Sequence, residues 1–379
     1  GLRNPWDITF DTEFNWLGTD NDPGPQHDRI FMPIEHGHYT MRHPYKFDWN
    51  GKHEAIAPVA ALFPTVSGSG TGVIFNQTDY FGKEQQGRYF IADWTNKSVF
   101  SYKYKWEGAH QSLDGDLEKI LDGGLTNGGD LGFKGGKGVT LFRPTDIEIG
   151  PSGDLYIAGW GSVYGTEYIR GTDWDKKENS KYQGRIFRLF NTAKPYSIKT
   201  WSMEKRQKPI NEWTFAQVME DMGSHLPVWR TNAQDEMVRR GLKIKEQLTN
   251  ELNSGKLNTA AKTWTLWALA HIEKENNGDY KNIIAYAKGE NKADLNVQIQ
   301  AVRALGLFRV SVAQSTFVET LKSSEPRLRH ASLLGLQKVG FGEYNDSIFS
   351  SLAKETDRVC NYTAFQVMRR VFSIDERKQ

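Results

Sequence analysis

Two internal repeats of different period divide this chain, and they constrain its fold more than any other feature. Before about residue 205, Gly, Trp, Tyr, Phe and Asp are interleaved with short runs of β-prone residues. After that point Ala, Leu, Lys, Glu and Gln dominate, and apolar residues recur three and four positions apart. The first pattern is typical of strands separated by turns, and the second is typical of amphipathic helices. The sequence therefore predicts a multidomain chain with a β region followed by an α region.

A unit of three short strands recurs in the β region. The units begin at Asp7, Gly72 and Asp146, about 65 and then about 74 residues apart. In the third unit Gly150–Gly153 predicts a tight turn, because its Pro presets φ and its Gly accepts positive φ. The spacing exceeds the roughly 40–50 residues of compact propeller repeats, so the loops between strands must be long. We interpret the units as about three blades of a β-propeller.

Three blades are too few to close a propeller. Propellers typically close with about four to eight blades, and an open ring exposes unpaired strand edges. We therefore expect residues 1–195 to be the C-terminal part of a longer propeller, and the natural chain to start upstream of Gly1. Residues 196–212 are predicted as a linker.

The α region, residues 213–376, carries its own repeat. Five segments with small and large apolar residues at helical spacing recur every 30–36 residues: Asn232–Val238, Thr265–Leu269, Ala301–Leu305, Ala331–Leu336 and Ala364–Met368. Each helix pair needs its neighbours to bury its apolar face, so such repeats stack. The pattern resembles HEAT-like repeats. It predicts an α-helical solenoid whose concave face is available to a protein partner.

Charge and cysteine content argue against several classes of function. The chain has 48 Lys and Arg against 46 Asp and Glu, a net charge of +2, so no charge bias favours nucleic acid. The single cysteine, Cys360, excludes an internal disulfide, a cysteine metal cluster and the paired-cysteine haem motif. No apolar run approaches the roughly 18–20 residues of a membrane helix. We expect no nucleic-acid partner and no membrane span.

The start of the β region, Gly1–Pro5 followed by Asp7–Phe10, resembles the propeller of glucose/sorbosone dehydrogenase-like proteins of the quinoprotein type. Further segments carry the same resemblance: Glu35–Tyr39, Arg88–Trp94 and Arg143–Tyr156. A propeller followed by HEAT-like repeats also resembles secreted dehydrogenase-like proteins of planctomycetes and bacteroidetes, which often continue into a cytochrome domain. The resemblance implies part of a quinone-dependent oxidoreductase that oxidises a sugar or alcohol hydroxyl or an aldose. It also implies a periplasmic or secreted location.

In quinone-dependent members of that family an Arg-Asn pair binds pyrroloquinoline quinone (PQQ), and this pair matches Arg3 and Asn4. The family's later basic contacts match Lys97 and Arg143. Arg suits this ligand because PQQ bears carboxylates, which a guanidinium binds bidentately. The alternative is that these arginines pair with carboxylates of neighbouring blades. The family's catalytic base is a histidine of an earlier blade, so the resemblance places the base outside this chain and implies that the fragment alone is inactive.

The loop Asp20–Asp28 stands where the family binds calcium. Its candidate ligands are Asp20, Asp22, Gly24 and Pro25. Carboxylates and carbonyls in a turn shaped by Gly and Pro suit Ca²⁺. The loop is not an EF-hand, because Phe31 stands twelfth where Glu is required. The alternative is an Asx-rich turn whose side chains cap their own backbone.

Trp94 and Trp160 directly follow the second strand of their units, and we assign them as candidate substrate-binding rings. Exposed aromatic rings stack on sugars and flat cofactors, whereas packing between blades is the alternative. A different function also fits the sequence. The chain would then be a non-catalytic carbohydrate- or haem-binding propeller, with the HEAT-like repeats as a scaffold for a cytochrome or another protein.

Overall fold

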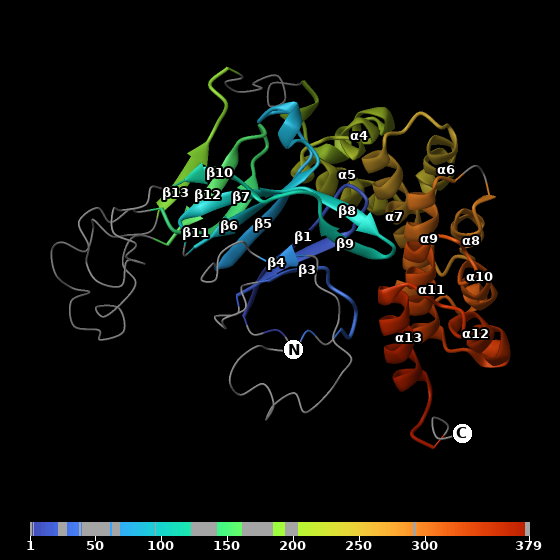
Figure 1. Cartoon of the computed structure of the whole chain (residues 1–379). Coiled ribbons are helices and arrows are strands. Elements are labelled where there is room, and N and C mark those ends of the chain that lie inside the picture. Colours follow the sequence, from blue (N-terminus) through green and yellow to red (C-terminus); the bar gives the residue numbers. More distant parts are fainter. Residues whose placement is uncertain are drawn as a thin grey trace, which may run out of the picture.

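The β region and the α region lie side by side (Figure 1). The computed structural model describes residues 4–21, 29–37, 69–94, 96–122, 142–160, 185–193, 204–290 and 293–375, together with Leu2, Tyr39 and β4 (Ala61–Leu62). Sheets fill one side of the molecule, and the helices run in chain order along the other side, from α4 to α13. None of the described helices combines the length and the apolar stretch that a bilayer crossing requires.

Each predicted three-strand unit forms an antiparallel sheet. The first sheet orders β1 (Pro5–Phe10), β2 (Trp16–Asp20), β3 (Arg29–Phe31) and β4. The second orders β5 (Gly70–Asn76), β6 (Arg88–Asp93), β7 (Ser98–Tyr102) and β10 (Glu118–Asp122), with the short helix η1 (Lys83–Gln85) between β5 and β6. The third comprises β11 (Pro144–Ile149), β12 (Leu155–Gly159) and β13 (Arg185–Leu189). A separate hairpin joins β8 (Tyr104–Glu107) to β9 (His110–Leu113).

The sheets pack face to face through two apolar cores. One core joins the first sheet to the second, with Leu17 and Ile30 against Val73 and Tyr89. The other joins the second sheet to the third through residues that include Ile74, Phe90, Ile147, Ile157 and Phe142. The described sheets are not closed into a barrel. The prediction of a β region is therefore confirmed, and the propeller stays a prediction.

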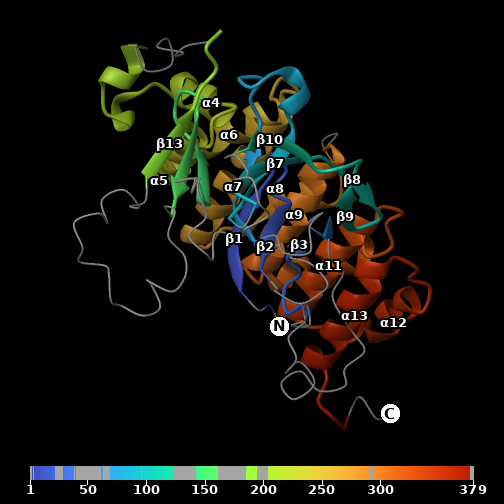
Figure 2. The same cartoon turned by 60° about the vertical axis from the view of Figure 1, so that its left-hand side comes forward.

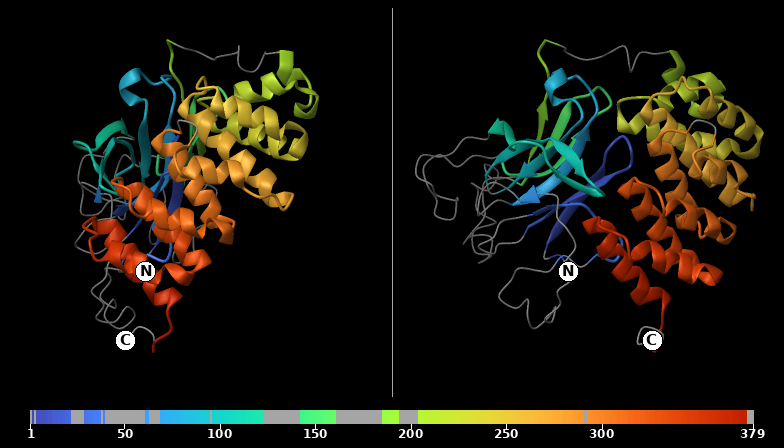
Figure 3. Two further views of the ribbon diagram at one scale, coloured as in Figure 1. Left: turned by 90° about the vertical axis from the view of Figure 1, so that its right-hand side faces the viewer. Right: turned by 45° about the vertical axis from the view of Figure 1, so that its right-hand side comes forward.

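The helices form two layers, which Figure 3 shows from two sides. The outer layer holds α4 (Phe215–Met222), α6 (Lys245–Asn253), α8 (Lys281–Ala287), α10 (Gln314–Thr320) and α12 (Asn345–Leu352). The inner layer holds α5 (Pro227–Arg240), α7 (Thr259–Glu275), α9 (Leu295–Leu307), α11 (Pro326–Val339) and α13 (Arg358–Val371). Short 3₁₀ turns accompany them: η3 (Glu204–Gln207), η4 (Ile210–Glu212), η5 (Gly241–Ile244), η7 (Ser311–Ala313) and η8 (Gly342–Tyr344). All five predicted repeat segments lie in inner-layer helices.

Local sequence explains where the inner helices begin. Asn258 and Asp294 accept hydrogen bonds from backbone N–H groups in the first turns of α7 and α9. Asp357 does the same for α13, while Pro227 and Pro326 occupy the first positions of α5 and α11. Side-chain oxygens and prolines at these positions satisfy or remove N–H groups that have no partner within the helix.

The inner layer faces the β region, not an open groove. Arg230 of α5 donates to Gln77 Oε1 (2.6 Å), Trp264 of α7 packs on Phe14 (5.0 Å between ring centroids), and Asp357 accepts from the Ala109 N–H (3.0 Å). Gln300 and Arg303 of α9 donate to the Glu13 and Phe14 carbonyls, and Arg327 of α11 lies 3.5 Å from Glu13 Oε2. The helical repeats thus bind the β region of their own chain across several helices (Figure 2).

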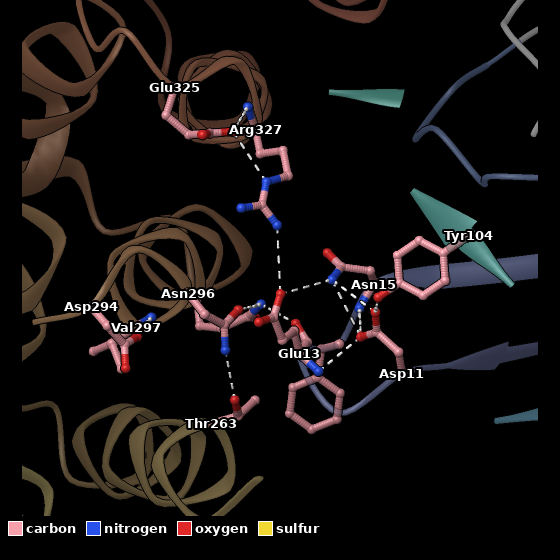
Figure 4. A network of polar contacts seen from close by, with 12 residues as sticks. Asp11, Glu13, Asn15, Tyr104, Thr263, Asp294, Asn296, Val297, Glu325 and Arg327 are labelled. Carbon is pink, nitrogen blue, oxygen red and sulfur yellow. Dashed lines mark hydrogen bonds and ion pairs between the residues drawn. The ribbon is translucent and has the colours of Figure 1, made fainter. Parts of the chain in front are cut away.

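The turn Asp11–Asn15 between β1 and β2 is the centre of this interface (Figure 4). Inside the turn, Asp11 Oδ1 accepts from the N–H groups of Glu13 (2.8 Å) and Asn15 (2.9 Å). Tyr104 of β8 donates to Asp11 Oδ2 at 2.7 Å. Burial raises the pKa of the Asp11 carboxyl, and these hydrogen bonds oppose that rise. The shape of the turn is therefore held by hydrogen bonds within the β region itself.

The predicted domain boundaries, after residues 195 and 212, lie between the last described strand and the first described α-helix. Strand β13 ends at Leu189 and α4 begins at Phe215. Apolar residues of the first sheet, such as Phe31 and Ile34, share one core with the helices. The two regions are continuous in packing although they differ in sequence pattern.

Candidate functional site

The predicted site residues that the structure describes lie at one edge of the three sheets. At this edge the first strand of each sheet begins and the second strand ends, with Pro5 opposite Asp20, Gly70 opposite Asp93 and Pro144 opposite Gly159. We call the residues at this edge the strand-end cluster: Asn4, Asp20, Asn21, Ser69, Asp93, Trp94, Asn96, Lys97, Arg143 and Trp160.

Hydrogen bonds tie the three sheets together at this edge. The Thr19 hydroxyl donates to the Thr71 carbonyl, and the Thr71 hydroxyl donates to the Pro144 carbonyl at 2.8 Å. The Trp6 indole N–H crosses from β1 to the Thr145 carbonyl at 2.6 Å. Residues far apart in sequence are therefore fixed relative to one another.

The first sheet contributes a buried ion pair. Arg29 Nε donates to Asp20 Oδ2 at 3.0 Å, and the guanidinium also donates to the Tyr39 carbonyl. The other oxygen of Asp20 accepts from the Asn4 N–H at 2.8 Å. Both charged side chains are almost fully buried. The Asp20 carboxylate is thus engaged by a cation and by the backbone.

The second sheet contributes a turn built on Asp93, at the end of β6. Its carboxylate accepts from the N–H groups of Ser69 (3.1 Å) and Asn96 (2.9 Å), and from the Asn96 amide (2.7 Å). Asn21 of the first sheet donates to Ser69 Oγ at 2.8 Å. Lys97 follows with φ of 54° and a side chain only 4% exposed. The turn places a buried cation at the edge.

The third sheet contributes Arg143, which is fully buried. Its guanidinium lies 4.4 Å from the ring centroid of Trp94, a cation–π contact between neighbouring sheets. Its carbonyl accepts from the Trp160 N–H at 2.8 Å, and Trp160 is 44% exposed. Burial lowers the pKa of Arg143 from its ordinary value. Trp94 is therefore covered on one face, whereas Trp160 offers surface to a ligand.

The structure brings together most of the candidate residues. Those at the strand-end cluster are Asn4, Asp20, Trp94, Lys97, Arg143 and Trp160. Those outside the described residues are Arg3, Asp22, Gly24 and Pro25. Asp93 and Asn96 belong to the cluster, and Arg29 pairs with Asp20 of the cluster; none of the three was predicted from the sequence. Asp20 and Asp93 end equivalent strands, which is a signal in the sequence, but the pairing of Arg29 depends on the register of β2 and β3.

No group of three or more His, Cys, Asp or Glu side chains within the described residues is placed to hold a metal ion. Of the predicted calcium ligands only Asp20 is described, and Arg29 and Asn4 already engage its carboxylate. The other predicted ligands lie outside the described residues, so the calcium site stays a prediction.

Comparisons with known proteins leave the family of this chain open. No protein family and no curated protein matches it. Among solved structures, it is similar to the CpcE–CpcF complex of phycocyanin lyase from Nostoc sp., with TM-score 0.32 and 16% identity over 40% of this chain and 96% of that chain. It is also similar to a putative oxidoreductase (glucose dehydrogenase) from Thermus thermophilus, with TM-score 0.31 and 14% identity over 50% of this chain and 44% of that chain. At these TM-scores neither likeness defines the fold or the function.

Proposed function

We propose that this chain is part of a quinone-dependent sugar or alcohol dehydrogenase-like oxidoreductase, and that the strand-end cluster binds PQQ. One observation carries the proposal: the cations Lys97 and Arg143 and the rings of Trp94 and Trp160 meet at one edge of two sheets. Buried cations raise the positive potential around them more than exposed ones, because the protein interior screens charge weakly. The cluster thus combines what a flat, anionic ligand requires.

Each residue of the cluster has a role in this proposal. Lys97 and Arg143 are buried, so they attract the carboxylates of the ligand through their charge, and the exposed ring of Trp160 stacks against a flat face of the ligand or a sugar. When bound, PQQ supplies the hydride-accepting quinone. We assign no described residue as the catalytic base, which the family resemblance places on a histidine outside this chain. We route no step through calcium, because Asp22, Gly24 and Pro25 lie outside the described residues.

Calorimetric titration of PQQ, with and without Ca²⁺, tests the proposal. We expect saturable binding to the parent protein, and at least a tenfold loss of affinity in Arg143→Ala and in Trp160→Ala. A tenfold loss corresponds to about 1.4 kcal/mol, the scale of one charge-assisted contact. Phe190→Ala is the matched control, because Phe190 is 47% exposed at the opposite end of β13. Absence of PQQ binding, or equal losses in the control, would refute the cofactor site.

A second candidate function is carbohydrate binding without catalysis, and the exposed Trp160 favours it. This function predicts binding on a glycan array that is lost in Trp160→Ala, with no dye-linked oxidation of the bound sugar in the presence of PQQ.

A partner such as a cytochrome would contact the outer helix layer, because the inner layer is covered by the β region. We propose a periplasmic or secreted location with either function, which fractionation of the source cells tests.

A further inference from the structure

A cavity of about 660 Å³ lies between the first sheet and the inner helices, away from the strand-end cluster. Strands β1 and β2 and the residues after β3 form one wall, and α5, α7, α9 and α11 form the other. Most of its lining is apolar, and Phe10, Phe14, Trp16 and Trp267 contribute rings. A volume of this size is typical of small-molecule pockets.

Several apolar side chains of the lining are exposed, whereas an interface that only packs two regions together would bury them. Ile8 and Trp16 on the sheet side are 47% and 43% exposed, and Leu307 at the end of α9 is 51% exposed. Burying such surface under an apolar ligand contributes roughly 25 cal/mol per Å². The pocket therefore favours a ligand with an apolar body.

His330 of α11 supplies an unused polar group in this lining. Its side chain is 8% exposed, and its Nε2 atom is buried without a hydrogen-bond partner. Buried polar atoms in folded proteins nearly always have a partner, so an orphaned one in a pocket wall points to a ligand atom. Burial, helped by the charge of Arg303, lowers the pKa of His330 to about 4, so the imidazole is neutral at pH 7.

Arg303 carries the charge of the lining that no ion pair neutralises among the described residues, while the carboxylates of Asp11 and Glu13 act on it from outside the lining. Arg303 of α9 donates to the Phe14 carbonyl at 2.9 Å and to Asn15 Oδ1 at 3.4 Å. Among the described residues, no carboxylate oxygen lies within ion-pair distance of Arg303. The remaining charged groups of the lining compensate each other, because Lys338 Nζ lies 3.0 Å from Glu35 Oε2. An anionic head group is therefore preferred over a cationic one.

We infer that this pocket binds a small aromatic carboxylate, with the rings against Trp16 and Leu307 and the carboxylate toward His330 and Arg303. The neutral imidazole donates one hydrogen bond to the carboxylate, and the guanidinium contributes the charge. This site is separate from the proposed PQQ site and does not depend on it.

Calorimetric titration of 2-naphthoate into the full chain tests the inference, with the neutral 2-naphthylmethanol as the matched ligand. We expect one saturable site for the carboxylate and at least tenfold weaker binding of the alcohol. His330→Leu should weaken naphthoate binding at least tenfold while the protein stays folded, because the replaced nitrogen has no partner in the fold. Gln337→Leu is the control on the same helix, since it also removes buried unpartnered polar atoms but lies outside the pocket lining.

Three outcomes would overturn the inference: no saturable binding to the parent, equal affinity for carboxylate and alcohol, or full binding by a folded His330→Leu protein. Thermal unfolding of each variant shows whether it is folded. Because PQQ is itself an aromatic carboxylate, Trp160→Ala separates the two sites. That variant should keep its affinity for naphthoate, whereas loss of naphthoate binding there would also refute the pocket.

Discussion

His330 and the pair Asp20–Arg29 show two different ways in which this protein buries charge-bearing side chains. His330 is kept neutral by its surroundings and has an unpartnered nitrogen, whereas Asp20 and Arg29 bury opposite charges in contact. Both environments depend on residues distant in sequence, so neither follows from local motifs. For each of the two environments we predict how a substitution changes the free energy of unfolding.

The first prediction concerns stability below neutral pH. The pKa of His330 is about 4 in the folded protein, below its ordinary value of 6.5, so the unfolded state binds more protons between these values. His330 therefore makes its full contribution to the free energy of unfolding above pH 6.5. This contribution is lost as the pH falls from 6.5 to about 4, and the total loss is about 3 kcal/mol. Burial lowers this pKa most, the charge of Arg303 lowers it further, and Asp357 opposes the shift.

Urea unfolding at pH 7.5 and pH 4.5 measures this effect as the difference between the parent protein and His330→Leu. The chain also has buried carboxyls with raised pKa values, including Asp7, Asp11, Glu13 and Glu148. Their contribution to the free energy of unfolding increases as the pH falls, which is opposite to that of His330. They are common to both proteins and cancel in the difference. An equal loss of stability in the two proteins on acidification would contradict the assignment to His330.

The second prediction concerns the ion pair at the strand-end cluster. Arg29→Met should lower the free energy of unfolding by about 3–5 kcal/mol, because Asp20 then keeps a buried charge without a cation. The double variant Asp20→Leu with Arg29→Met should recover most of this loss, since it removes both charges. Chemical denaturation of the parent, single and double variants measures the coupling. A single variant as stable as the parent would show that the pair is not buried as described.

Trp94 and Trp160 are predicted from the repeat, because each follows the second strand of its unit, whereas Lys97 and Arg143 are predicted from the family resemblance. Trp94, Lys97, Arg143 and Trp160 flank strand ends in equivalent units, and the fold brings them to one edge. The contact of Arg143 with Trp94 requires the packing of one sheet on another, which the repeat alone does not contain. The pocket at His330 was not predicted, because it arises between regions of different sequence pattern.

At the scale of elements, the first strands of the second and third sheets approach each other closely. A Cβ added to Gly72 in β5 would lie 2.6 Å from Asp146 Cα in β11, closer than side chains tolerate. Glycine is required here by the distance between two backbones, neither of which has a flexible end to move aside. This contact fixes how the two sheets pack.

The third prediction follows from this contact. Gly72→Ala should lower the free energy of unfolding by about 1–3 kcal/mol, the range of overpacked sites, because β5 and β11 must separate. Gly223→Ala is the control, since its nearest contact is the Asn258 amide nitrogen at 3.2 Å, in a side chain that can move. Thermal unfolding of both variants checks the result. Equal stability of the two variants would contradict the close packing of the sheets.

The sequence predicted most elements, and the missed ones have weak patterns. The three-strand units and the repeat helices show clear periods, and all appear in the structure. Strand β10 and the hairpin β8–β9 were not predicted; each of these strands has only four or five residues and is only partly buried. Sheet packing, and with it the propeller interpretation, depends on long-range contacts that a strand pattern does not contain.

At the scale of the whole molecule, the helical repeats bind the β region of their own chain. The Asp11–Asn15 turn contacts α9 and α11 (Figure 4), and the first sheet shares a core with the helices. The sequence predicted two regions, and the structure joins them into one packed unit. The face expected to hold a protein partner is covered in this way.

The fourth prediction concerns this interface. Gln300→Ala removes the donor to the Glu13 carbonyl, and it should increase hydrogen–deuterium exchange in the Asp11–Asn15 turn at least severalfold. Exchange in the third sheet should not change, because that sheet packs on the second sheet. Lys262→Ala is the control, because it breaks an ion pair with Asp294 between neighbouring helices and leaves the turn contacts intact. Unchanged exchange in the turn would show that α9 does not hold it.

A crystal structure of the full chain with PQQ tests the central claim most directly. We expect ligand density at the strand-end cluster, against the exposed face of Trp160 and at the edge that holds Lys97 and Arg143. Density only in the pocket beside His330, or no ligand density at saturating PQQ, would contradict it.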